Sequence, residues 1–176
     1  MSPRLDPQVL PRYVDRLYRA AWALCGSPHE AEDLVQETFV RVLARPRVLR
    51  GDDELAYLMR VLRNTFLSSR RTASRRPHVT AQVEELDLAD ERLGDRPEQA
   101  LEAQQLYGAI AELPEDFRLA LVAVDIIGLS YGEAARLLDT GESTITTRLH
   151  RARRRVVSSI DGPAEREGSA AERRLD

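Results

Sequence analysis

The sequence predicts an all-α protein of two small helical domains joined by a flexible linker. The chain of 176 residues is 43% hydrophobic but only 5% aromatic, which suits packed cores and points away from β-rich folds. Apolar residues recur at helical spacing through residues 7–71 and again through 100–159. The pattern weakens over the linker, residues 72–99, and is lost in the tail, residues 160–176, which we expect to be disordered.

Two helices are expected at the start of the chain. An apolar stripe over residues 9–24 predicts the first, which ends near Gly26. Ser27 then caps the second helix, with proline at its first position and Glu30 three residues after the cap. Pro46 stops this helix, because proline lacks an amide hydrogen and its ring clashes with the preceding turn.

A third helix is expected after a short basic loop. Asp52 or Asp53 caps it, and its apolar residues run through 55–66. The chain then changes the sign of its charge, because residues 60–76 hold arginines without an acid and residues 84–98 are acidic. Blocks of like charge favour solvated, weakly ordered chain, so we interpret this stretch as a flexible tether.

The C-terminal domain is expected to begin with a helix over residues 100–113. Pro114 opens the next helix, whose apolar residues lie within 119–126. Ser130 and Glu133 form a capping box, in which each residue satisfies a free backbone amide near the start of a third helix.

A short turn and an arginine-rich helix complete this domain. The turn is residues 139–141, and Gly141 tolerates the left-handed conformation that tight turns often need. In the helix that follows, one face is apolar, formed by Ile145, Leu149, Ala152 and Val156. Two short helices joined by a tight turn are typical of a helix-turn-helix that reads duplex DNA.

The outward face of the last helix has the residue types that reading DNA requires. Short polar side chains near its start suit base edges, and they are Glu142, Ser143, Thr144, Thr146 and Thr147. Arginines further along suit phosphates, and they are Arg148, Arg151, Arg153, Arg154 and Arg155. A solvated basic helix without a ligand is the alternative interpretation.

The remaining chemistry of the sequence argues against an enzyme and against a metal or cofactor site. Cys25 is the only cysteine, so neither an internal disulfide nor a cysteine-based zinc site is expected. His29, His78 and His150 lie far apart and belong to no catalytic motif. No stretch has the length and hydropathy of a membrane span, so we expect no membrane insertion and a cytoplasmic protein.

Five segments together resemble one family. They are AEDLVQETFVRVL at 31–43, YLMRVLRNTFLSSRR at 57–71, LPEDFRLALV at 113–122, GLSYGEAARLL at 128–138 and STITTRLHRARRRV at 143–156. In this order they resemble the extracytoplasmic-function group of bacterial RNA polymerase sigma factors. The resemblance covers regions 2 and 4 of that family, leaving only the linker and the tail.

The resemblance implies the partners of the chain. Region 2 would dock on the β′ clamp of core RNA polymerase through the segment 31–43, in particular Glu32, Asp33, Leu34, Gln36, Glu37 and Phe39. Region 4 would bind the β flap and read the −35 element as duplex DNA. An anti-sigma factor is a further expected partner. For Asp33, Gln36 and Glu37 a solvated helix face is the alternative, and only the resemblance favours docking over it.

The resemblance also implies that residues 57–71 engage the melted strand of the −10 element. Tyr57 stands where the family usually has tryptophan. A basic helix along the backbone suits strand opening, and its residues here are Arg60, Arg63, Asn64, Arg70 and Arg71. A pocket for a flipped base is expected in the preceding loop, formed by Arg47, Arg50, Asp52 and Asp53. For Asn64, a local helix hydrogen bond is the alternative.

The sequence therefore favours an alternative sigma factor that binds core polymerase and directs promoter-specific initiation. A stand-alone helix-turn-helix regulator is the alternative function. Such regulators usually dimerise to read two half-sites, and no dimerisation helix is evident here. Binding to duplex DNA by the chain alone, as opposed to binding only with core polymerase, distinguishes the two.

Overall fold

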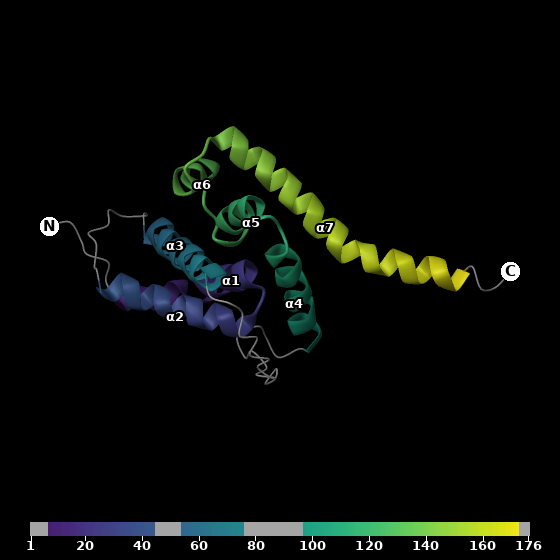
Figure 1. Ribbon diagram of the computed structural model, residues 1–176, viewed down its shortest axis with the longest axis horizontal. Helices are drawn as coiled ribbons and strands as arrows, with labels where there is room; N and C mark the ends of the chain where they lie inside the picture. The colour runs from purple at the N-terminus through teal and green to yellow at the C-terminus, as the bar shows by residue number, and fades with distance from the viewer. Residues whose placement is uncertain (1–6, 45–53, 76–96, 173–176) are drawn as a thin grey trace.

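The computed structural model describes residues 7–44, 54–75 and 97–172, with side chains except at positions 7, 9, 74–75, 97 and 163–172. Within these ranges the chain forms helices and short turns and no strand (Figure 1). None of the described helices has the length and apolar character needed to span a membrane. The all-α prediction is confirmed for the described residues.

The N-terminal lobe contains η1 (Pro7–Tyr13), α1 (Val14–Cys25), α2 (Pro28–Ala44) and α3 (Glu54–Arg75). The stripe expected as one helix is divided, because Pro11 lies inside η1, which is a 3₁₀ helix. Gly26 ends α1 in the left-handed conformation, with φ of 81°. Ser27 caps α2 as expected, since its Oγ accepts a hydrogen bond from the Glu30 amide at 3.4 Å.

The C-terminal lobe contains α4 (Pro97–Ala111), α5 (Glu115–Leu121), the π-helical turn η4 (Val122–Ile126), α6 (Tyr131–Leu138) and α7 (Glu142–Glu172). Both ends of the expected linker are helical, because residues 72–75 belong to α3 and residues 97–99 to α4. The rest of that linker, residues 76–96, lies outside the described residues.

The structure departs from the expected disordered tail. The backbone of α7 continues without interruption to Glu172, and Figure 1 shows it as one long helix that projects beyond the other elements. Residues 164–172 include three alanines and three glutamates, which are strong helix formers, and they outnumber the poor helix formers Gly162, Pro163 and Gly168 in this part of the helix. A projecting helix needs no apolar stripe, which explains why periodicity did not predict it.

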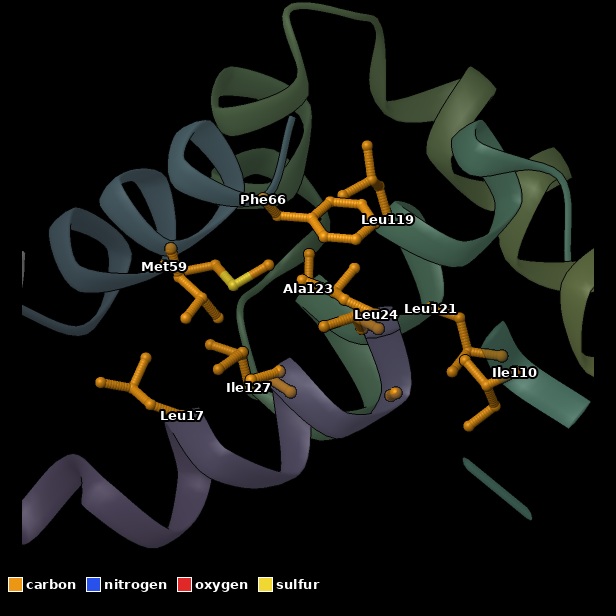
Figure 2. Packing of buried hydrophobic residues seen from close by; sticks show 14 of the residues in the cluster. Leu17, Leu24, Met59, Phe66, Ile110, Leu119, Leu121, Ala123 and Ile127 are labelled. Carbon is orange, nitrogen blue, oxygen red and sulfur yellow. The ribbon is translucent and has the colours of Figure 1, made fainter. Parts of the chain in front are cut away.

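The two lobes share one apolar core. Helix α1 lies against α4 and η4 of the other lobe. Figure 2 shows Leu24 of α1 and Phe66 of α3 converging with Leu119, Ala123 and Ile127 in a single cluster of buried side chains. Apolar area removed from water between the lobes favours this closed arrangement by roughly 25 cal/mol per Å².

Polar contacts reinforce the contact between the lobes. Arg118 of α5 is 9% exposed, and its Nη1 donates to the Leu24 carbonyl oxygen at 2.7 Å. An aromatic contact adds to them, since the ring centroids of Trp22 and Tyr107 lie 4.8 Å apart. Arg70 of α3 forms an ion pair with Glu115 at 3.6 Å. The C-terminal lobe is therefore docked on the N-terminal lobe through contacts at several positions.

Candidate nucleic-acid interface

The helix-turn-helix consists of α6, the turn after it and the start of α7. Ser130 Oγ accepts from the Glu133 amide at 3.3 Å, and the Ser130 amide donates to Glu133 Oε2 at 2.7 Å, which confirms the capping box. Hydrogen bonds from the Ser130 hydroxyl and then its amide lower the pKa of Glu133 below its ordinary value. In the turn, Asp139 and not Gly141 is left-handed, with φ of 51°. Aspartate tolerates this conformation because its short side chain bonds locally.

Helix α7 has one face buried in the lobe and the opposite face exposed. The four residues of the predicted apolar stripe are all buried, which confirms that prediction: Ile145, Leu149, Ala152 and Val156. With about 100° of rotation per residue, the positions over residues 142–158 that lie within about 50° of the direction opposite this stripe are Ser143, Thr147, His150, Arg151, Arg154 and Ser158. All six are exposed. The outward face of α7 therefore presents three short hydroxyl side chains, a histidine and two arginines.

Three other arginines of α7 contact their own lobe. Arg148 Nη2 donates to Asp116 Oδ2 at 2.7 Å. Arg153 donates to both carboxylate oxygens of Asp125, from Nε at 2.9 Å and from Nη2 at 2.6 Å. The guanidinium of Arg155 lies over the Phe117 ring, 5.1 Å from its centroid. These three arginines, all expected to suit phosphates, thus have partners within their own lobe.

The electrostatic environment of Arg153 reflects this pairing. Its hydrogen bonds to Asp125 raise the pKa of the guanidinium above its ordinary value, and nearby Tyr131 acts in the same direction. The bidentate geometry explains the strength of the effect, because a planar guanidinium matches a carboxylate at two points.

Two of the three threonines expected near base edges use their hydroxyls inside the helix. Thr146 Oγ1 donates to the Glu142 carbonyl oxygen at 3.0 Å, and Thr147 Oγ1 donates to the Ser143 carbonyl oxygen at 3.1 Å. Both residues are exposed. A threonine that directs its hydroxyl hydrogen back along the helix still offers a methyl group and oxygen lone pairs to a ligand.

Helix α3 presents a second exposed basic face. By helical rotation of about 100° per residue, one side of the helix carries Tyr57, Arg60, Asn64 and Arg71. Asn64 also makes a local hydrogen bond with its neighbour in the helix, since its Oδ1 accepts from Arg63 Nη1 at 3.3 Å. Arg70 lies on the side toward the C-terminal lobe, where it pairs with Glu115. The four residues expected to form the base pocket, Arg47, Arg50, Asp52 and Asp53, lie outside the described residues.

Helix α2 carries the segment expected to dock on polymerase. Glu32, Asp33 and Gln36 are exposed, and Glu37 forms an ion pair with Arg41 at 2.6 Å. Leu34 is buried and Phe39 is partly buried against the core, so neither offers a free apolar surface. The exposed apolar side chains of this helix are instead Val40 at 66% and Leu43 at 50%.

Sequence reasoning missed the acidic partners in α5 and η4. Nothing local predicts that Asp116 and Asp125 each meet an arginine, 32 and 28 residues further along the chain respectively. Arg118 was not singled out either, although it is buried. The position of Val40 opposite the buried residues of α2 did carry a signal, since helical rotation alone predicts its exposure.

Comparison with known proteins identifies the two lobes separately. The family model for Sigma-70 region 2 matches residues 10–76, and the model for Sigma-70 region 4 matches residues 103–156. The ECF RNA polymerase sigma factor EcfG of Rhodopseudomonas palustris is 35% identical over 147 residues, which cover 81% of this chain and 78% of that protein. The chain belongs to the ECF sigma factors.

Other relatives support this assignment. The ECF RNA polymerase sigma factor SigE of Mycolicibacterium smegmatis is 34% identical over 153 residues, and the chain spans 59% of the length of that protein. Among solved structures, the sigma factor RpoE in complex with the anti-sigma factor NepR from Bartonella quintana matches 88% of this chain and 95% of that one. The TM-score is 0.67 and the identity 28%. As an ECF sigma factor, the chain directs promoter-specific transcription initiation.

Proposed function

We propose that three exposed helical faces divide the work of initiation in this sigma factor. The face of α2 binds core RNA polymerase at the β′ clamp, the face of α3 holds the melted −10 strand, and the outward face of α7 reads the −35 duplex. Region 4 also contacts the β flap. The observation that carries the proposal is the face of α7, where exposed Thr147, Arg151 and Arg154 lie opposite a fully buried stripe.

The docking face on α2 combines acidic, amide and apolar side chains. Its members share one side of the helix at a spacing of three and four residues: Asp33, Gln36, Val40 and Leu43. Two apolar side chains exposed beside an acid are costly to leave in water and suit a protein partner.

The double variant Asp33→Ala with Gln36→Ala tests this face. We expect weaker binding to core polymerase in a pull-down and an unchanged far-UV circular dichroism spectrum. The matched control is Glu102→Ala with Gln105→Ala, an acid and an amide at the same spacing on exposed positions of α4. Equal affinity of both double variants for core would remove the docking assignment.

The face of α3 is suited to single-stranded DNA because it joins an aromatic ring to cations. Tyr57 supplies a surface on which a base can stack, and Arg60 and Arg71 supply charge along the backbone. Replacing Arg60 and Arg71 by alanine should reduce permanganate reactivity of thymines in the −10 region at equal occupancy of the promoter. Unchanged reactivity would contradict this role.

An anti-sigma factor is the further partner that we propose, and the cytoplasm is the proposed location. The structure of RpoE with NepR supports the partner by similarity. The inhibitor is expected to cover α2 around residues 34–39 and part of region 4. Hydrogen exchange of the chain alone and with each co-purifying protein tests this, and exchange that is insensitive to every partner would argue for control by expression level.

A further inference from the structure

The pairing of α7 with its own lobe has a geometric regularity. Arg148 pairs with Asp116 of α5, and Arg153 pairs with Asp125 of η4. At about 100° per residue, these two arginines lie roughly 70° to either side of the buried stripe. One ion pair therefore holds each flank of the helix, and rotation of α7 about its axis in either direction stretches one of them.

The aspartates also lie where a phosphate contact would be unfavourable. Asp116 is 64% exposed at the start of α5, next to one flank of α7. A carboxylate repels phosphate and competes with it for the same guanidinium. Arg153 is the more completely occupied of the two arginines, since its Nε and Nη2 are both bonded to Asp125.

The arginines opposite the buried stripe differ in this respect. Among the described residues, neither Arg151 nor Arg154 makes an ion pair with another side chain. Both are exposed. The basic helix thus contains two classes of arginine that its sequence does not distinguish, one held by acids of the same lobe and one open to a ligand.

We propose that Asp116 and Asp125 are positioning residues for promoter reading. Through Arg148 and Arg153 they fix the rotation of α7 about its axis, so that Thr147 faces the groove, while Arg151 and Arg154 bind the phosphates. The inference rests on the proposed reading of the −35 element by α7. Exposed ion pairs contribute little to stability, so orientation is the property that these pairs are expected to control.

The salt dependence of promoter binding separates the two classes of arginine. The sigma factor is bound to core polymerase, and the probe is a promoter duplex selected from a random library by the wild-type holoenzyme. Arg151→Ala and Arg154→Ala should each reduce the slope of log K against log salt by about 0.9, the value for one lost phosphate contact. Arg153→Ala should leave the slope unchanged. A reduction of the same size in Arg153→Ala would overturn the proposal.

Discrimination between promoters tests the positioning role itself. The double variant Asp116→Asn with Asp125→Asn keeps the shape of both side chains and removes their charge. We expect the ratio of affinities for the selected duplex and for one with a substituted −35 element to fall by at least about threefold. Far-UV circular dichroism and the melting temperature report whether the variant is folded. An unchanged ratio in a folded variant would also overturn the proposal.

The same measurements distinguish failure of this inference from failure of the proposed function. If Arg151→Ala and Arg154→Ala leave the salt slope at its wild-type value, α7 does not bind DNA phosphates and both ideas are wrong. If they lower it and the aspartate variant discriminates normally, α7 reads DNA without help from the two acids.

Discussion

Arg118 Nη1 lies 2.7 Å from the carbonyl oxygen of Leu24, a residue 94 positions earlier in the chain. The same guanidinium donates from Nε and Nη2 to the Leu113 carbonyl oxygen at 3.3 and 2.9 Å. Both carbonyls stand at or beyond helix ends, where the helix itself supplies no donor. Burial lowers the pKa of Arg118, although an arginine remains protonated at neutral pH. One buried cation thus joins the C-terminal end of α1 to region 4.

Removing this cation should destabilise the closed arrangement. In Arg118→Ala two carbonyl oxygens lose a charged donor, and we expect a loss of about 2–3 kcal/mol in the free energy of unfolding. Urea unfolding measures the loss, and small-angle scattering should show a larger radius of gyration. Arg41→Ala is the control, because Arg41 is exposed on α2 and pairs only with Glu37 within the described residues. Equal unfolding free energies for the two variants would show that the contact between the lobes does not depend on Arg118.

The closed arrangement matters because the proposed ligands lie far apart. The −10 and −35 elements are separated by about 25 base pairs, or roughly 85 Å at 3.4 Å per pair. We infer that two lobes that share a core do not reach both elements at once. We therefore expect that contacts between the lobes oppose promoter binding and that weakening them favours it.

Gly26 offers a controlled way to weaken these contacts. A Cβ at this position would lie 2.9 Å from the Ala111 Cβ of the other lobe, and Gly26 also has φ of 81°. Gly128 has a similar φ of 86° but no atom within 4 Å of an added Cβ. Gly128→Ala should therefore cost about 1 kcal/mol from backbone strain alone, whereas Gly26→Ala should cost more and enlarge the radius of gyration.

A compensating change makes this prediction sharper. Ala111→Gly removes the Cβ that meets the new side chain, so it should restore compactness in Gly26→Ala while leaving the cost of the left-handed backbone. A Gly26→Ala variant as compact as Gly128→Ala would indicate that the lobes adjust without opening.

The helices and caps were predictable because their causes are local. The buried positions of α7 follow from the spacing of Ile145 to Val156, and the capping box follows from the Ser130 and Glu133 pair. Contacts between distant segments were not predictable. No residue near Arg118 in the sequence predicts its hydrogen bond to the Leu24 carbonyl oxygen. A turn that contains both Asp139 and Gly141 does not show in advance which residue becomes left-handed.

Cys25, the single cysteine, is the last residue of α1 and follows Leu24, whose carbonyl accepts the hydrogen bond from Arg118. Burial raises the pKa of the Cys25 thiol to about 12 from 9.0, with the charge of Glu30 adding to the effect. We expect alkylation by iodoacetamide at pH 8 to be at least about tenfold slower than in denaturant, because the thiolate is the reacting form. Labelling at equal rates in both conditions would contradict the burial of this thiol.

The sign of the pH dependence follows from the same pKa. Unfolding returns the thiol to its ordinary pKa near 9, so above that pH the unfolded chain loses its proton first. The contribution of Cys25 to stability is therefore complete below pH 9 and is lost as the pH rises toward 12. Cys25→Ala should lose less stability than the wild type between pH 8 and 10.5, as measured by urea unfolding at each pH.

Thr147 is expected to read a base through its methyl group. Its hydroxyl donates to the Ser143 carbonyl oxygen at 3.1 Å. The methyl group therefore remains available for contact with DNA, on an exposed side chain opposite the buried stripe. A threonine methyl group packs well against the methyl group of thymine in the major groove.

Thr147→Val keeps the shape and methyl group and removes the hydroxyl, so the −35 preference should persist. Thr147→Ser keeps the hydroxyl and removes the methyl group, so discrimination at one base pair should fall by about 1 kcal/mol. In vitro selection of promoters by each holoenzyme measures both, and the reverse order of the two variants would show that the hydroxyl makes the contact.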